Sequence, residues 1–270
     1  MLVTRLVTAL ALLAAFLAAV LLLERATFAA VVTLVVGLAG HEWGRLCRMP
    51  ERAASAYGMG LAMAFALLVW LLFPVSVSVP AAGAIFAAAA VFWLVGVPLW
   101  LHRGLGRGRW LPLAGLVVVL PAALATIALA GPALLLVLAL VWIADTMAYV
   151  TGRALGRRKL APSISPGKTW EGAGGALAGA LAYSIVCAML VPQLSQAVRG
   201  VAWLPYLGGA ALLCGVSILG DLLESAVKRH ASVKDSGTLL PGHGGVLDRI
   251  DSATAVLPVA VLMLHWIAPT

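Results

Sequence analysis

Long apolar segments follow one another along almost the whole of this 270-residue sequence. Each has roughly 17–25 residues, the length that a helix needs to cross the ~30 Å hydrocarbon core of a bilayer. A chain inside lipid must satisfy its own backbone hydrogen bonds, so segments of this kind form helices. The sequence therefore predicts an all-α, polytopic membrane protein with about nine transmembrane helices. The predicted spans cover residues 6–23, 27–44, 57–74, 79–101, 111–129, 132–150, 172–192, 203–224 and 253–268.

The composition agrees with lipid as the solvent. Charged residues make up 10% of the chain and the mean hydropathy is +1.07, whereas about 25% of residues are charged in soluble domains. The apolar core of a secretory signal peptide has about 7–15 residues. The first apolar segment here is longer, and further spans follow at once, so we expect it to be a transmembrane span that is not cleaved. The three cysteines lie in or beside predicted spans without paired spacing, which indicates packing roles and not a disulfide framework or a zinc site.

The distribution of basic residues predicts the orientation in the membrane. Sixteen of the eighteen lysines and arginines precede the first span or follow an even-numbered one, which leaves Arg25 and Arg199 on the other side. The positive-inside rule therefore places the N-terminus and these loops in the cytoplasm. The net charge of +8 then reflects topology, and nucleic acid is not an expected partner because no face or tail carries a basic block.

The acidic residues are concentrated in two stretches. Residues 221–251 hold five of the ten, residues 145–171 hold two more, and the two stretches together hold all four lysines. A charge placed in hydrocarbon costs about 2.5–3.5 kcal/mol, so such residues usually face a polar cavity. We therefore divide the chain into an N-terminal transmembrane region, 1–140, and a C-terminal catalytic region with cytoplasmic loops, 141–270.

One further polar cluster, His41-Glu42-Trp43, ends the second predicted span. Two interpretations remain open for it. It fits an interfacial belt with Trp43 at headgroup depth, and it also fits a wall of the active site.

The pair Ser165-Pro166 has the pattern of a helix N-cap followed by proline at the first helical position, which predicts that the seventh span begins there. A helix start offers free N–H groups to phosphate, and Lys168 adds a full charge beside it. The triplet 167–169 imitates the end of a P-loop, but Pro162 stands where that motif needs glycine, so we reject a P-loop.

The end of the eighth span carries Asp221, Glu224, Ser225 and Lys228, which share one helical face because they are spaced i, i+3, i+4 and i+7. A surface stripe of ion pairs would have the same pattern. The glycine-rich loop that follows, residues 242–245, allows positive φ angles and close approach of backbone N–H groups to an anion.

Asp248 and Asp251 open the last span, spaced i, i+3. Aspartates at the mouths of neighbouring helices suit a hard cation that keeps open positions for substrate phosphates. His243 has no second histidine or cysteine nearby, so we interpret it as a phosphate-binding or loop-ordering residue and not as a metal ligand.

Residues 225–251, with Ser-x-Val-Lys-Arg-x4-Lys-Asp-x-Gly-x2-Leu-Pro-x-His-Gly-Gly-Val-x-Asp-Arg-Ile-Asp, resemble the signature of the phosphatidate cytidylyltransferase family. Residues 165–172 resemble a second block of that family, and Asp145 with Ala148-Tyr149 a third. The resemblance covers roughly residues 141–255.

The resemblance implies that CTP and phosphatidic acid react to give CDP-diacylglycerol and pyrophosphate for phospholipid biosynthesis, at the cytoplasmic face of the inner cell membrane. It implies Mg²⁺, with or without a second cation beside it, and it leaves open whether the protein is a homodimer. The expected metal ligands are Asp221 and Asp248, with Asp251 or Asp145 in support. The expected catalytic residues are Asp221, Asp248, Lys168, Lys234 and Arg249. The expected substrate-binding residues are Ser165, Lys168, Thr169, Glu171, Ser225, Lys228, Arg229, Asp235, His243, Gly244 and Gly245.

Two alternative functions compete with this one. A CTP-dependent lipid kinase of the polyprenol or phytol type would transfer the γ-phosphoryl group of CTP instead. A transporter would need ionisable residues near the midplane of several spans, whereas here they gather at the cytoplasmic ends.

Overall fold

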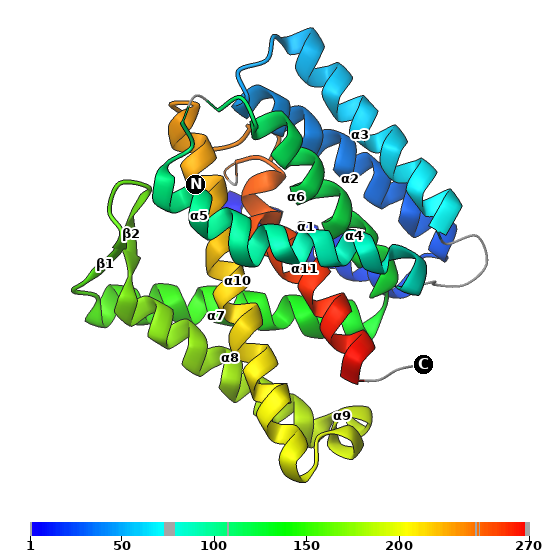
Figure 1. Cartoon of the computed structure of the whole chain (residues 1–270), viewed down its shortest axis with the longest axis vertical. Coiled ribbons are helices and arrows are strands. Elements are labelled where there is room, and N and C mark those ends of the chain that lie inside the picture. The colour runs from blue at the N-terminus through cyan, green and yellow to red at the C-terminus, as the bar shows by residue number, and fades with distance from the viewer. Residues whose placement is uncertain (1, 73–78, 107, 241, 243, 268–270) are drawn as a thin grey trace.

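The computed structural model describes residues 2–72, 79–106, 108–240, 242 and 244–267 (Figure 1). The chain is almost entirely helical, with one small two-stranded sheet. The helices are α1 Leu2–Leu22, α2 Arg25–Leu46, α3 Glu51–Leu72, α4 Val79–Val91, the π-helical η1 Phe92–Gly96, α5 Val97–Arg103, α6 Leu111–Ala128, α7 Pro132–Leu155, α8 Trp170–Leu190, α9 Pro192–Ala197, the 3-10 helix η2 Gly200–Ala202, α10 Trp203–His230 and α11 Leu247–Ile267. The strands are β1 Lys159–Ala161 and β2 Ser165–Thr169.

In the described residues every predicted span coincides with a helix, and α4, η1 and α5 together form the fourth. Residues 73–74 of the third predicted span and residue 268 of the ninth lie outside the described residues. Within the described ranges, seven helical segments are long and apolar enough to cross a membrane. The all-α polytopic class is thereby confirmed. The number of spans and the cytoplasmic N-terminus stay predictions.

The predicted start of the seventh span at Ser165-Pro166 is wrong. Residues 165–169 form β2, which pairs antiparallel with β1, and α8 begins only at Trp170. Thr169 supplies the cap, because its hydroxyl accepts a hydrogen bond from the Gly172 amide at 3.1 Å. Pro166 is tolerated in a strand that pairs on one side only, since it lacks an N–H to donate. Lys168 nevertheless remains beside the helix start.

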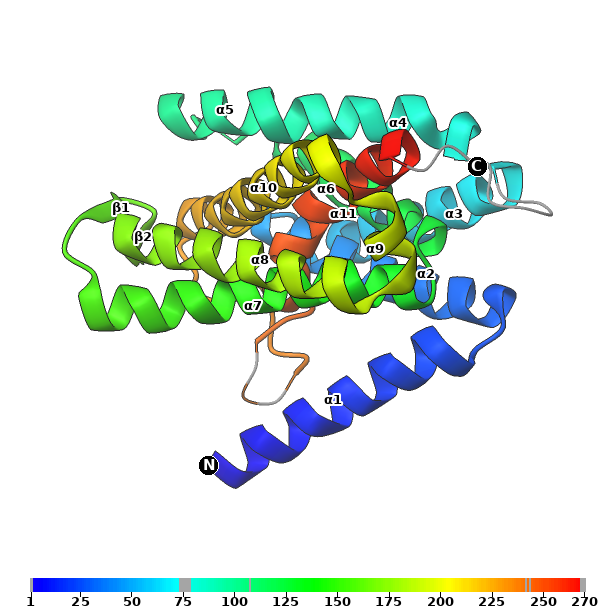
Figure 2. The same ribbon diagram turned by 90° about the horizontal axis from the view of Figure 1, so that it is seen from below.

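The helices pack in pairs around α11. Helix α2 lies along α3, α7 along α8, and α10 along α11, while α11 also contacts α6, α4 and α7. The closely packed α7–α8 pair depends on glycine, because a Cβ at Gly175 or Gly179 would collide with side chains of α7. Figure 2 shows α1 set apart from the other helices.

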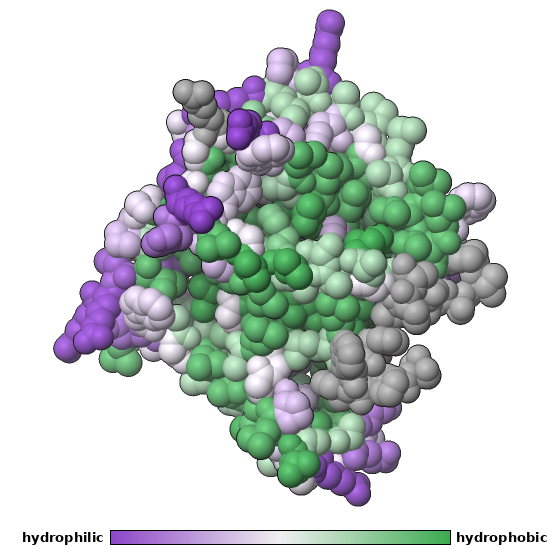
Figure 3. Space-filling model, viewed as in Figure 1, coloured by the Kyte–Doolittle hydropathy of each residue, from purple (hydrophilic) through white to green (hydrophobic). Residues whose placement is uncertain are grey.

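The buried core runs continuously across the proposed boundary at residue 140. It joins Phe65 and Leu124 from one side to Leu223 and Leu247 from the other, all at most 1% exposed. Large apolar side chains are also exposed, as suits a surface in lipid. Figure 3 shows apolar residues over most of one face, with many hydrophilic residues at the edge where Figure 1 places the β1–β2 hairpin. The functional division at residue 140 stays a prediction.

Candidate active site

A cavity of about 540 Å³ opens between α7, the β1–β2 hairpin, α8, α10 and α11. Its lining includes four aspartates drawn from three helices: Asp145, Asp221, Asp248 and Asp251. The structure therefore brings all four acids that the sequence analysis selected to one cavity. Ser165, Lys168 and Thr169 of the hairpin, three of the expected substrate-binding residues, line the same cavity.

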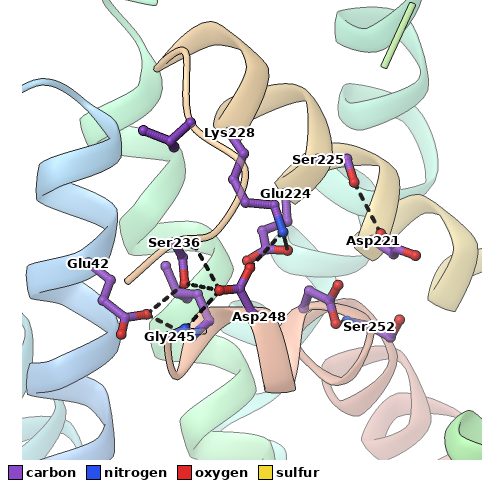
Figure 4. A network of polar contacts seen from close by, with 12 residues as sticks. Glu42, Asp221, Glu224, Ser225, Lys228, Ser236, Gly245, Asp248 and Ser252 are labelled. Carbon is purple, nitrogen blue, oxygen red and sulfur yellow. Dashed lines mark hydrogen bonds and ion pairs between the residues drawn. The ribbon is translucent and has the colours of Figure 1, made fainter. Parts of the chain in front are cut away.

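Lys168 connects the hairpin to α10. Its ammonium Nζ lies 2.5 Å from Oδ2 of Asp221, and the two side chains are 22% and 35% exposed. Oδ1 of Asp221 accepts a hydrogen bond from the Ser225 hydroxyl at 3.2 Å, one turn along α10 (Figure 4). Asp221 therefore faces the cavity with a cation already beside it.

Lys228 forms a buried bridge between α10 and α11. Its Nζ lies 2.7 Å from Oε2 of Glu224 and 2.7 Å from Oδ1 of Asp248. Figure 4 shows Lys228 pointing toward both carboxylates. The Lys228 side chain is 12% exposed and its two partners 5% each. The predicted helical face is confirmed, but it is not a surface stripe, and the charge of Lys228 is compensated by protein carboxylates.

The second oxygen of Asp248 holds the loop before α11. Oδ2 accepts hydrogen bonds from the Ser236 amide at 2.8 Å, the Ser236 hydroxyl at 3.0 Å and the Gly245 amide at 2.8 Å. Gly242 and Gly244 have φ angles of 75° and 82°, so the expectation of left-handed glycines is correct for these two, whereas Gly245 does not adopt a positive φ. In this loop, however, the Gly245 amide serves Asp248 and is not left open to a ligand anion.

Glu42 of α2 reaches the same loop from the N-terminal half. It is 5% exposed, and its carboxylate accepts hydrogen bonds from the Ser236 hydroxyl and from the amides of Val246 and Leu247, each at 2.9 Å. Trp43 is 1% exposed and donates from its indole N–H to the carbonyl of Leu111. The burial of Trp43 contradicts the interpretation as an interfacial belt. The cluster does not line the cavity; Glu42 supports the loop that precedes α11.

Several expected site residues lie outside the cavity. The Glu171 carboxylate accepts hydrogen bonds from the backbone amides of Arg157 and Arg158, so it holds the chain before β1. Four other expected site residues, all within the described ranges, are exposed and do not line the cavity: Arg229, Lys234, Asp235 and Arg249. Ser225 and Lys228 touch lining acids without lining the cavity themselves. His243 lies outside the described residues.

The cavity also has lining residues that the sequence analysis missed. Ser217 and Ser252 are 1% and 3% exposed, and their hydroxyls have no hydrogen-bond partner among the described atoms. Arg153 lines the cavity from α7, where its Nη1 donates to the Tyr149 hydroxyl at 2.8 Å. The spacing of Asp145, Tyr149 and Arg153, each four residues apart, could have identified this face of α7.

The cavity carboxylates suit a magnesium ion better than a metal whose ligands must all come from the protein. Within the described part of the chain, no three His, Cys, Asp or Glu side chains form a ready-made metal site. Mg²⁺ is usually held by one or two carboxylates together with substrate phosphates, so a cavity with several separate aspartates fits it. The unpartnered hydroxyls of Ser217 and Ser252 leave polar atoms for a further ligand.

The fold and the site together define a polytopic helical membrane protein with an acid-lined cavity bridged by lysines. The chain belongs to the cytidylyltransferase family, whose model matches residues 3–267. It is 43% identical over 283 aligned positions, covering all of both chains, to the phosphatidate cytidylyltransferase of Pseudomonas aeruginosa. A protein of the same name from Haemophilus influenzae is 50% identical over 125 residues, 46% of this chain and 43% of that relative. Another, from Brucella abortus, is 44% identical over 177 residues, 63% of each chain. The chain is therefore a nucleotidyltransferase, and the family resemblance is confirmed.

Proposed function

We propose that this enzyme transfers CMP from CTP to phosphatidic acid and so forms CDP-diacylglycerol and pyrophosphate. The full-length similarity to the Pseudomonas aeruginosa relative supports this choice of substrates. The observation that carries it is the single cavity in which four aspartates from α7, α10 and α11 meet a lysine beside the start of α8. Such a site suits two phosphate-bearing substrates and a divalent cation.

In the proposed reaction an oxygen of the phosphatidate phosphate attacks the α-phosphorus of CTP. A new P–O bond forms, the bond from the α-phosphorus to the oxygen that bridges to the β-phosphorus breaks, and pyrophosphate leaves with that electron pair. A phosphomonoester has its second pKa near ~6, so the attacking oxygen is largely ionised at neutral pH and needs no strong general base. Catalysis then depends on positioning and on electrostatic stabilisation.

Asp145, Asp221 and Asp251 are the proposed magnesium ligands. Mg²⁺ supplies positive charge to the phosphates and to the departing pyrophosphate when it is bound. Asp248 lines the same cavity, and its role as a ligand stays a prediction, because Lys228 occupies one of its oxygens and three donors occupy the other.

Lys168 and Arg153 are the proposed phosphate-binding cations. Both line the cavity. In the described part of the chain Arg153 forms no ion pair with a carboxylate, so its guanidinium is available for bidentate binding of a phosphate. Tyr149, its hydrogen-bond partner, is 64% exposed on α7, beside the apolar surface that suits lipid. We assign Arg153 to the lipid phosphate and Lys168 to the nucleotide.

The proposed orientation places this cavity on the cytoplasmic side of the inner cell membrane. Residues 151–171 and 225–252, which follow the sixth and eighth predicted spans, carry nine of the eighteen lysines and arginines, which favours the cytoplasm by the positive-inside rule. The acyl chains of phosphatidic acid would then stay in the bilayer while its phosphate meets CTP at the interface.

The test is an assay of the purified protein with CTP, phosphatidic acid and Mg²⁺, with the lipid product identified by mass. We expect CDP-diacylglycerol, and label from γ-labelled CTP should appear in pyrophosphate. Transfer of the γ-label to lipid would instead indicate a CTP-dependent lipid kinase and would overturn the proposal.

A further inference from the structure

Glu42 is a buried carboxylate of α2 that is held by neutral hydrogen-bond donors. Within the described residues no lysine, arginine or histidine forms an ion pair with it. Its negative charge is met instead by the amides of Val246 and Leu247, at the start of α11, where the helix dipole favours an anion. Its partners lie about 200 residues further along the chain, so it ties the N-terminal half to the loop before α11.

The Ser236 hydroxyl lies between Glu42 and a cavity aspartate, and its single hydrogen is shared between the two carboxylates. The Ser236 oxygen lies 2.9 Å from Oε2 of Glu42 and 3.0 Å from Oδ2 of Asp248, and all three side chains appear together in Figure 4. Ser236 is only 5% exposed. Any shift of Glu42 would therefore be transmitted directly to the Asp248 carboxylate.

The surroundings of Glu42 are shaped for two carboxylate oxygens. Oε1 accepts from the Val246 amide, while Oε2 accepts from the Leu247 amide and the Ser236 hydroxyl. Glutamine has one acceptor oxygen, so its NH₂ group would face a donor on one side. Gly245 leaves the space that both oxygens occupy, because a Cβ there would collide with them.

We propose that Glu42 is a positioning residue for the transfer reaction, which orients Asp248 through Ser236 and through the first amides of α11. This inference rests on the proposed function. Glu42 does not line the cavity, so it acts on the substrates only through Asp248 and the loop.

Glu42→Gln tests the proposal. The kcat for CDP-diacylglycerol formation should fall by about 10–100-fold, the usual loss when a residue that orients an active-site ligand is changed. The KM values for CTP and phosphatidic acid should change less than about threefold, because the phosphate-binding residues stay in place. The matched control is Glu51→Gln, which makes the same charge change at an exposed site that pairs with His41 and Arg45 and does not touch the loop. It should leave kcat within about twofold of the wild-type value.

Ser236→Ala provides a second variant that keeps the amide contacts of Glu42 and removes the hydroxyl bridge. It should also lower kcat. The double variant Glu42→Gln, Ser236→Ala should have a kcat within about twofold of that of the less active single variant, because both changes disturb the same contact to Asp248. If Glu42→Gln does not fold, Glu42→Asp replaces it, because this variant keeps the charge but withdraws the carboxylate from Ser236 and the amides, and it should also lower kcat. A folded Glu42→Gln protein with near wild-type kcat, or losses that multiply in the double variant, would overturn the proposal.

Hydrogen exchange separates this inference from the proposed function. Amides in residues 235–248 should exchange faster in Glu42→Gln than in the wild-type protein, and Glu51→Gln should leave them unchanged. If the wild-type protein forms no CDP-diacylglycerol, the proposed function fails, while the exchange result still decides whether Glu42 holds the loop. Unchanged exchange in Glu42→Gln would overturn the positioning role.

Discussion

Replacing Lys228 by methionine should destabilise the protein strongly, because it would leave two buried carboxylates without their cation. Lys228 contacts Glu224 and Asp248 at 2.7 Å, and all three side chains are at most 12% exposed. Breaking a buried ion pair by removing one partner costs about 3–5 kcal/mol. We therefore expect Lys228→Met to lower the free energy of unfolding by about that amount.

The matched comparison is Lys168→Met, which removes the other lysine that pairs with a cavity aspartate. Lys168 and Asp221 are 22% and 35% exposed, so water screens this pair and its loss should cost at most about 1 kcal/mol. Both variants would be unfolded by SDS titration in mixed micelles and followed by tryptophan fluorescence. Adding Glu224→Gln to Lys228→Met should recover part of the loss, because one uncompensated carboxylate is removed.

Equal destabilisation by the two lysine substitutions would refute this reasoning. So would a Lys228→Met protein whose free energy of unfolding lies within about 1 kcal/mol of the wild-type value, since surface substitutions have effects of that size.

Three further predictions concern the cavity and the loop. Asp221→Asn should lower kcat at least about 100-fold, as expected for a group that acts on the transition-state charge. The free energy of unfolding should change by less than about 1 kcal/mol. Loss of folding in parallel with activity would contradict this prediction. Arg153→Gln should raise the KM for phosphatidic acid at least about tenfold and leave the KM for CTP within about twofold. The control is Arg157→Gln, which changes a neighbouring arginine outside the cavity lining and should alter neither KM. A selective rise in the KM for CTP would reassign Arg153 to the nucleotide. Gly245→Ala should destabilise the protein by about 1–3 kcal/mol, because the new Cβ would collide with Glu42 and Ser236. The free energy of unfolding is measured by the same SDS titration. A stability equal to that of the wild type would contradict this prediction and show that the loop can adapt.

The helices could be predicted from the sequence because the length of an apolar run limits what a chain can do in lipid. Local spacing was also sufficient to place Asp221 with Lys228 on one face of α10 and Asp248 with Asp251 on one face of α11, while Asp145 was selected through the family resemblance. These features depend on residues that are close in the sequence, where helical periodicity decides which side chains lie together.

Other features depend on contacts that local patterns do not contain. The Ser165-Pro166 pair has a helix-start pattern, yet pairing with β1 extends it into a strand and leaves the cap to Thr169. Lys228 could serve a ligand or a protein carboxylate, and only the approach of α11 shows that it binds Asp248. The partners of Glu42 lie in the second half of the chain, so its role could not be read from residues 41–43 alone.

The most direct test of the proposed active site is a structure of the protein with CTP and Mn²⁺ as a substitute for Mg²⁺, in which anomalous scattering locates the metal. We expect the metal in the cavity, contacting Asp221 and at least one of Asp145 and Asp251, with the phosphates of CTP beside Lys168. Metal and nucleotide bound instead among the exposed residues Arg229, Lys234 and Arg249, with the cavity free of both, would contradict the assignment of this cavity as the active site.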